Sequence, residues 1–236
     1  MQQPELFAKL GFGGQVRNLV LLGEAGCGKS EIGLNIAAAL VHEGMQKVEY
    51  YDLDMTKPLF RARDKADLMR EMGVEFHFEE QFMDAPTAVG GVRRSLKSES
   101  FTILDVGGDH IGARAVGGYA PLINSPDTVV LYIINSFRPW AKSIESIDQV
   151  MGEILGVSHI NLNQLMFVGN PNLGPGTTAD EVISGTEKLT GFLTPYAKLS
   201  FICAEESIAQ DVQAKTDLFV LPLSLRMGYP WDADIN

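Results

Sequence analysis

The stretch from Arg17 to Ser30, RNLVLLGEAGCGKS, decides how the rest of the chain is interpreted. Four apolar residues, Leu19 to Leu22, run directly into Gly23–Ser30, which fits the pattern G-x-x-x-x-G-K-[ST]. Glycines let the backbone of such a loop curl so that its N–H groups point inward at phosphate oxygens. In this pattern Lys29 reaches the β- and γ-phosphates, and the Ser30 hydroxyl binds Mg²⁺.

The residues around this phosphate loop, Gly23–Ser30, give the context that the pattern needs. An apolar strand precedes it, and Ile32, Ile36 and Leu40 then recur every four residues, which predicts an amphipathic helix that begins at Lys29. The positive end of that helix dipole faces the phosphates. The alternative, a chance glycine-rich turn, explains neither flank. We therefore assign nucleotide binding to Gly23, Glu24, Ala25, Gly26, Cys27, Gly28, Lys29, Ser30 and Glu31.

Composition limits the kind of protein that carries this loop. The 236 residues are enough to bury a large core, and we expect a single α/β domain over 1–236. A net charge of −11 argues against nucleic acid or anionic lipid as a partner, because few cations are available to displace counterions. Two cysteines, no signal peptide pattern and no long apolar run predict a cytoplasmic protein without a membrane span.

Strands and helices alternate along the chain. Apolar or alternating runs predict strands at 18–22, 47–53, 74–78, 101–106, 128–134, 165–168, 198–203 and 218–223. Helical spacing predicts helices at 29–42, 63–72, 85–96, 140–155 and 178–193, with a short one from 207. This order is typical of a doubly wound, mostly parallel sheet flanked by helices, the fold of the phosphate-loop NTPases.

Polar motifs follow these predicted strands, so they are expected to converge at the carboxyl edge of the sheet. Asp105 ends an apolar strand, as does the acidic residue that organises Mg²⁺ and its waters in phosphate-loop enzymes. The glycines after it, Gly107 and Gly108, suit a turn that moves in response to a γ-phosphate. We therefore assign Ser30, Asp105 and Asp52 to the metal site.

The DLD motif at 52–54 places two carboxylates on one side of an extended segment. One could orient the attacking water or hold Mg²⁺ through water, and the other could be structural. The sequence leaves open whether Asp52 or Asp54 is the functional one. Both are therefore assigned, together with Lys29, to catalysis.

These motifs together resemble the MinD/ParA-type ATPases, whose domain is described as a CobQ/CobB/MinD/ParA nucleotide-binding domain and which belong to the signal-recognition, MinD and BioD class. The resemblance is carried by GEAGCGKSEI, YDLDMTKPLFRARD, DVGGDHIGARAVGGYA, NSFRPW and NPNLG, in this order along most of the chain. It implies that Asn170 contacts an adenine ring. It also favours ATP over GTP, since the N/T-K-x-D signature of guanine binders is not found at that strand end.

Two departures limit what the resemblance implies. Family members usually carry a lysine at the second position of the loop, which reaches the partner subunit's nucleotide, but this chain has Glu24. A homodimer is therefore left open, and Arg61, Arg63, Arg114 or Arg138 would have to supply the missing charge, with Arg114 preferred. The basic C-terminal helix that MinD uses on membranes is replaced by the acidic WDAD at 231–234.

Three functions compete at this stage. The first is a slow, Mg²⁺-dependent regulatory or maturation ATPase whose nucleotide state is sensed by an unidentified protein partner. The second is an ATP-dependent ligase or kinase for a small molecule, with a second pocket lined by Arg61, Arg63 and Arg114. The third is a nucleotide-binding scaffold without turnover, which the intact Lys29, Ser30 and Asp105 weigh against.

Overall fold

The computed structural model describes residues 3–13, 15–54, 62–78 and 89–227. Eight strands form one sheet in the order β3-β2-β4-β1-β5-β6-β7-β8, and all neighbouring pairs are parallel. The strands are β1 (Asn18–Leu22), β2 (Val48–Asp52), β3 (Val74–His77), β4 (Phe101–Asp105), β5 (Thr128–Ile134), β6 (Leu165–Gly169), β7 (Leu199–Glu205) and β8 (Val220–Leu223). The parallel α/β fold predicted from the sequence is confirmed.

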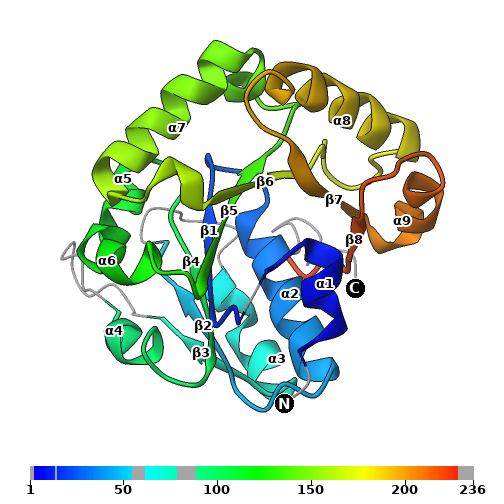
Figure 1. Ribbon diagram of the computed structural model, residues 1–236. Helices are drawn as coiled ribbons and strands as arrows, with labels where there is room; N and C mark the ends of the chain where they lie inside the picture. The colour runs from blue at the N-terminus through cyan, green and yellow to red at the C-terminus, as the bar shows by residue number, and fades with distance from the viewer. Residues whose placement is uncertain (1–2, 14, 55–61, 79–88, 228–236) are drawn as a thin grey trace.

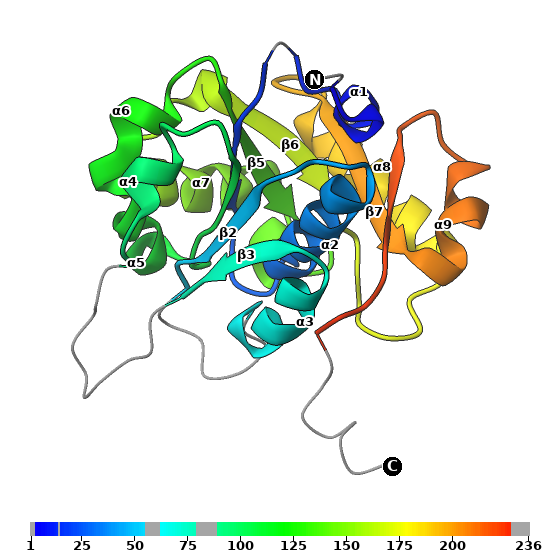
Figure 2. The same ribbon diagram turned by 90° about the horizontal axis from the view of Figure 1, so that it is seen from below.

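Helices cover both faces of this sheet (Figure 1). On one face lie α1 (Glu5–Leu10), α2 (Lys29–His42), η1 (Ala62–Lys65) and α3 (Ala66–Glu71). On the other lie α4 (Val92–Ser95), α5 (His110–Ala113), η2 (Arg114–Tyr119), α6 (Ala120–Ile123), η3 (Pro139–Ala141), α7 (Ile144–Ser158), η4 (Leu162–Gln164), α8 (Ala179–Leu193) and α9 (Glu206–Gln213). In Figure 2, α2 and α3 stand to the right of β2 and β3, and α4 to α6 to their left.

The centre of the sheet is buried on both faces, which explains its continuous apolar sequence. All five residues of β1 and all seven residues of β5 are buried. Each face packs its own apolar cluster, one beneath α1 to α3 and the other beneath α4 to α9. The strands that carry the expected motifs are therefore held on both sides by packed helices.

Several predicted elements differ in extent. The helix expected over 85–96 is observed only at α4, while 79–88 lie outside the described residues. The helix expected over 63–72 is divided into η1 and α3, with Lys65 at φ −110° between them. The segment before β1, where the sequence predicts no element, contains α1, whose Leu6, Phe7 and Leu10 are buried. Such short elements lack the several turns of periodic pattern on which sequence-based prediction depends.

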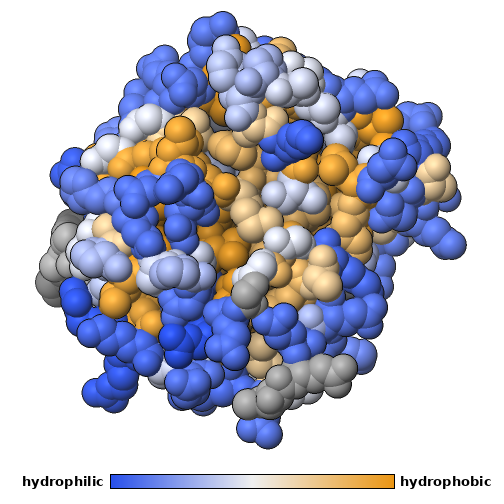
Figure 3. Space-filling model, viewed as in Figure 1, coloured by the Kyte–Doolittle hydropathy of each residue, from blue (hydrophilic) through white to orange (hydrophobic). Residues whose placement is uncertain are grey.

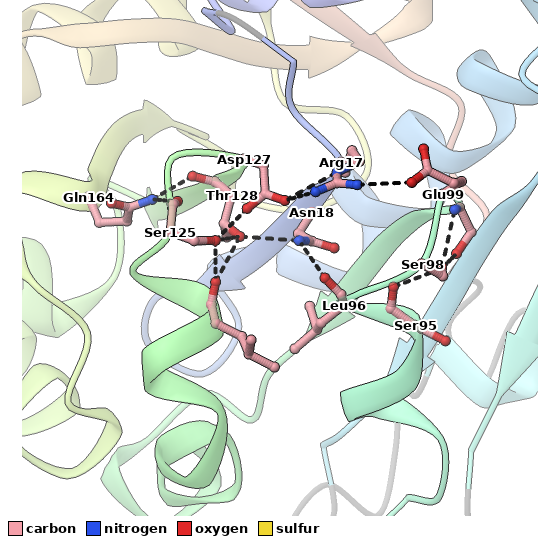
Figure 4. Close-up of polar contacts among 12 residues, drawn as sticks. Arg17, Asn18, Ser95, Leu96, Ser98, Glu99, Ser125, Asp127, Thr128 and Gln164 are labelled. Carbon is pink, nitrogen blue, oxygen red and sulfur yellow. Dashed lines mark hydrogen bonds and ion pairs between the residues drawn. The ribbon is translucent and has the colours of Figure 1, made fainter.

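A polar network holds the amino edge of the central strands (Figure 4). Arg17 donates from Nε and Nη2 to one carboxylate oxygen of Asp127, at 3.1 and 2.6 Å, and from Nη1 to Glu99 at 3.3 Å. The buried Asn18 amide donates to the carbonyl of Leu96 and to the hydroxyl of Thr128. These contacts link β1 to the segments that precede β4 and β5.

The surface seen in the orientation of Figure 1 carries apolar side chains across its middle, with polar residues around the margin (Figure 3). None of the helices in the described part of the chain combines the length and apolar composition that crossing a bilayer requires.

Candidate functional site

The strand order brings the predicted motifs together at the carboxyl edge of the sheet. β4 lies beside β1, with Asp105 in register with Leu21, and β2 lies beside β4, with Asp52 in register with Asp105. The turn after β4 and the DLD motif therefore end next to the phosphate loop that follows β1. The convergence expected from the sequence is observed for these three segments.

The phosphate loop has a conformation that depends on its glycines. Gly23, Gly26 and Gly28 have φ values of 135°, 71° and 99°, in the region that other residues rarely adopt. A Cβ on Gly23 would lie 2.3 Å from the carbonyl oxygen of Ile133, and one on Gly28 would lie 2.2 Å from the Asn170 side-chain nitrogen. The loop is therefore pressed against β5 on one side and against the residue after β6 on the other.

Lys29 is the first residue of α2, and its side chain folds back over the loop. Its ammonium donates to the carbonyl oxygens of Gly23 at 2.9 Å and Glu24 at 3.0 Å, and the residue is only 2 % exposed. A buried ammonium requires such partners because desolvation of a charge is costly. Ser30, the next residue, is also buried, in the first turn of α2. The cation is thus held where the loop surrounds a phosphate in the sequence pattern.

Asp105 is buried at the end of β4 and is oriented by Tyr50. The Tyr50 hydroxyl donates to Oδ2 of Asp105 at 3.0 Å. Burial, and then the nearby carboxylates of Asp105 and Asp52, raise the pKa of Tyr50 well above its usual value. The phenol therefore stays protonated and remains a donor to the carboxylate. Nothing in the sequence pattern singled out Tyr50, because its partner lies on a neighbouring strand.

The two carboxylates of the DLD motif have different surroundings. Oδ1 of Asp52 accepts from the backbone N–H of Asp54 at 3.0 Å, and Oδ2 accepts from the backbone N–H and Nε of Arg63 at 3.1 and 2.9 Å. In this ion pair the Asp52 side chain is buried, with 1 % exposed, and the Arg63 side chain is nearly so, with 9 % exposed. A second nitrogen of Arg63, Nη2, donates to the carbonyl of Asp54 at 2.5 Å. Asp52 therefore organises the segment between β2 and η1.

Asp54 lies against the glycine turn that follows Asp105. A Cβ on Gly107 would lie 3.2 Å from Oδ1 of Asp54 and 2.8 Å from Cα of Gly112. Asp54 itself is buried. The next residue of the turn, Gly108, approaches the phosphate loop so closely that a Cβ there would lie 2.5 Å from Cα of Ala25 and 2.9 Å from Nζ of Lys29. The turn then leads into α5, which Asp109 caps by accepting from the N–H of Gly112 at 2.7 Å.

Asn170 and Glu31, both expected to contact nucleotide, have protein partners in the structure. The Asn170 amide donates to the carbonyl of Cys27 at 2.8 Å and so supports the loop from outside. The Glu31 carboxylate accepts from the backbone N–H groups of Arg226 at 2.7 Å and Met227 at 3.0 Å. Burial raises the pKa of the Glu31 carboxyl. Contacts of either residue with a nucleotide stay predictions.

Glu24, at the second loop position, lies on the side of the sheet that α7 covers, opposite α2. Its half-buried side chain shares a small cavity with Tyr132, Trp140, Ile147 and Val150, near the start of α7. Burial raises the pKa of the Glu24 carboxyl. Glu24 of the loop and residues of α7 therefore line one cavity.

Of the four arginines considered from the sequence, the structure brings Arg138 to the phosphate loop. Its Nε donates to the carbonyl of Gly26 at 3.3 Å, and its guanidinium lies 3.9 to 4.0 Å from the position of a Cβ on Gly26. Arg63 is engaged with Asp52, Arg114 is exposed in η2, and Arg61 lies outside the described residues. The preference for Arg114 therefore gains no support from these contacts.

One group of metal-ligating side chains lies elsewhere among the residues that the structure describes. Ligand atoms of Glu49, Glu75 and His77, on β2 and β3, lie within 4.8 Å of one another. Lys47 already occupies this cluster, with its ammonium 3.1 Å from Glu49 and 3.6 Å from Glu75. His77 also stacks on the ring of Tyr51.

Comparison with known proteins supports the fold and leaves the family open. No family model and no curated protein matches the chain. Among solved structures, it resembles the signal recognition particle 54 kDa protein from Aeropyrum pernix K1 in complex with GDP, with a TM-score of 0.50 and 18 % identity over 80 % of this chain and 41 % of that one. It also resembles chloroplast FtsY from Physcomitrella patens, with a TM-score of 0.51 and 17 % identity over 80 % and 59 %.

A third similar structure is the signal recognition particle receptor FtsY from Elizabethkingia anophelis, with a TM-score of 0.52 and 14 % identity over 84 % of this chain and 63 % of that one. The chain thus spans between 41 % and 63 % of the length of these three proteins. At such identities the likeness shows the fold alone, a parallel sheet flanked by helices as in these solved structures. The MinD/ParA branch stays a prediction.

The close approach of the turn to the loop gives a first testable prediction. Gly108→Ala should destabilise the protein by about 1–3 kcal/mol, because the added methyl group meets backbone atoms of Ala25 that cannot move without displacing the loop. The measurement is the urea midpoint of unfolding. Gly152→Ala is the matched control, since a Cβ at Gly152 in α7 meets nothing within 4 Å. Equal effects of the two substitutions would contradict the proposed contact.

Proposed function

We propose that the chain binds a Mg²⁺–nucleoside triphosphate, ATP by preference, at the phosphate loop and hydrolyses it slowly, as a switch sensed by a partner protein. The observation that carries this proposal is the contact of Gly108 with both Ala25 and Lys29. It places the glycine turn after Asp105 against the residues that the sequence pattern assigns to the β- and γ-phosphates.

The roles follow from the contacts around the loop. Lys29 would exchange the carbonyls of Gly23 and Glu24 for phosphate oxygens, because an ammonium has three donors and phosphate is the stronger acceptor. Ser30 would bind Mg²⁺ directly, as the loop pattern requires. Asp105, oriented by Tyr50, would hold the waters of the metal.

Between the two aspartates, the contacts favour Asp54 as the group that orients the attacking water. Both oxygens of Asp52 are engaged by Arg63 and the backbone, which suits a structural role. Asp54 instead lies beside Gly107, in the turn that touches Lys29 through Gly108. A water between the γ-phosphate and this turn would be within reach of a carboxylate at that place.

The switch would work through the glycine turn. A γ-phosphate bound at Lys29 would act on Gly108, whose backbone is already in close contact with the loop. The turn continues directly into α5, and both α5 and η2 pack against α7. The presence of a γ-phosphate would thereby be transmitted to the surface formed by α7. Packed elements with two arrangements are the usual carriers of such changes.

Arg138 is proposed to supply the second positive charge at the loop, in place of the lysine that Glu24 replaces. The backbone N–H of Arg138 donates to the carbonyl of Asn135, and the Asn135 side chain bonds to the backbone of Phe137 and Asn172. These bonds fix the segment from which Arg138 extends. The guanidinium has five donors, of which one contacts Gly26, so others can serve phosphate oxygens.

The choice of ATP rests on the resemblance described above. Asn170, the residue expected to contact adenine, is hydrogen-bonded to the loop at Cys27. This position is compatible with an adenine ring on the β6 side of the loop. In the described part of the chain no contact favours the ligase or kinase alternative, because Arg63, assigned by that hypothesis to a second pocket, forms the ion pair with Asp52.

The central claim predicts the effect of Lys29→Ala. Loss of a charge-assisted contact to phosphate should weaken binding of Mg²⁺–ATP by roughly tenfold or more. Isothermal titration calorimetry with ATP and GTP measures both the loss and the preferred base. Lys215→Ala is the control, because Lys215 pairs with Asp180 on the surface. Unchanged affinity in Lys29→Ala would refute the phosphate-loop assignment, and tighter binding of GTP would refute the choice of ATP.

Substitution of the two aspartates, Asp52 and Asp54, should have different effects on hydrolysis and stability. Asp54→Asn should retain nucleotide binding and lose most hydrolysis in single-turnover assays. Asp52→Asn should instead lower the free energy of unfolding by about 3 kcal/mol, because Arg63 would lose its buried counter-charge. Asp52→Asn that is fully stable but inactive would reverse the assignment.

Arg138→Ala should weaken Mg²⁺–ATP binding about fivefold, and Arg138→Lys should restore part of the loss. The effect should shrink at high ionic strength, since salt screens a half-exposed cation. Arg114→Ala, in exposed η2, is the matched control and should bind as the wild type does. A loss in Arg114→Ala with none in Arg138→Ala would instead support the preference drawn from the sequence.

A further inference from the structure

A groove lies on the helical face opposite α2, between the first half of α7 and the end of α8. Its volume is about 870 Å³, and Phe167 of β6 contributes to its lining. Figure 1 shows α7 and α8 following one another along the same side of the sheet, with an end of one helix near an end of the other. Ile147, Met151 and Leu193 supply apolar side chains from the two helices. A concave apolar surface of this size is large enough to receive side chains of another molecule.

Two large apolar side chains at the groove are exposed to solvent. Leu162 is 58 % exposed and Tyr196 is 76 % exposed, and both line the groove. Tyrosine is enriched at sites where proteins meet, because it combines a large apolar ring with a polar group. Exposed apolar groups gathered at one hollow are typical of a binding surface.

The charges at the groove have one sign. Glu145 and Asp148, both exposed on α7, are among its lining residues, and the described lining contains no lysine, arginine or histidine. An occupant that matches this surface is apolar on one side and positively charged beside it. The acidic sequence WDAD at 231–234 of this chain has the wrong charge, and so have anionic lipids.

One residue links the groove to the phosphate loop. Ile147, which is 3 % exposed, lines the groove and also lines the small cavity that contains Glu24. α7 further packs against α5 and η2, which follow the glycine turn. A displacement of the loop or of the turn would therefore be transmitted to α7, and α7 forms one wall of the groove.

We propose that this groove is a docking site for an amphipathic helix of a partner protein, with an apolar face and adjacent lysine or arginine side chains. Helices bind in apolar grooves through side chains spaced three and four residues apart, and the apolar side chains of this groove, from α7, β6 and the end of α8, could receive such a face. The affinity of the groove for this helix changes with the nucleotide bound at the loop. Only this second part rests on the proposed nucleotide switch.

The test uses two fluorescent model peptides of 15 residues with the same helical leucine pattern, one with lysine and one with glutamate at the polar positions. Fluorescence anisotropy at about 0.15 M salt measures their binding to the full chain. The Leu/Lys peptide should bind, and the Leu/Glu peptide should bind at least about tenfold more weakly. Equal binding of the two peptides would overturn the proposed occupant.

Matched charge reversals locate the peptide. Asp148→Lys should weaken binding of the Leu/Lys peptide at least about fivefold, while Glu187→Lys, the same change of charge on α8 outside the groove lining, should not. Both sites are exposed, so the variants should fold, and circular dichroism checks this. Equal effects would mean attraction to the overall negative charge and would overturn the groove. Glu145→Gln is the milder substitute if Asp148→Lys unfolds.

The same assay separates docking from its coupling to nucleotide. Peptide affinity should differ at least about threefold between Mg²⁺–ADP and a non-hydrolysable ATP analogue, and Lys29→Ala should abolish the difference. If the chain binds no nucleotide but the Leu/Lys peptide still docks in a way that depends on Asp148, the proposed function is rejected and the groove is retained. Docking that ignores bound nucleotide would reject the coupling alone. A dimer in sedimentation that Asp148→Lys disrupts would assign the groove to a second copy and overturn the partner helix.

Discussion

The close contact between two backbone turns, Gly108 against Ala25, is the constraint on which the candidate site depends. It requires β4 to lie beside β1, because only adjacent parallel strands deliver their following loops to the same place. It also excludes any side chain at Gly108. The identity of one residue is thus set by the order of the strands, and the turn packs directly against the phosphate loop.

Around this contact the molecule buries several charges, and each has a specific partner. Lys29 uses loop carbonyls, Asp52 uses Arg63, and Asp105 uses the hydroxyl of Tyr50. Buried charges without partners would be too costly to retain, so these pairings hold the site in one arrangement. A ligand that replaces one of these partners would therefore also change the hydrogen bonds and ion pairs of the neighbouring charges. A switch is expected to respond to its ligand in this way.

The features that could be predicted from the sequence are those that depend on local residue patterns. The phosphate loop, the strands around it and the position of Asp105 follow from spacing and apolar runs, and the observed sheet confirms their arrangement. The separate surroundings of Asp52 and Asp54, and the contact of Arg138 with Gly26, were not predictable. Each depends on a partner from a distant part of the chain, and no periodicity in the sequence indicates that Arg138 contacts the loop.

The tie between Glu31 and the chain after β8 has a mechanical consequence. Glu31 lies two residues beyond Lys29, and its carboxylate holds the backbone of Arg226 and Met227, while Asn35 holds Ser224 through a pair of hydrogen bonds. Tension applied to the chain beyond Met227 would therefore load the first turns of α2 before it loads the sheet. A fused domain or a surface tether at that end would pull on the helix that begins with Lys29.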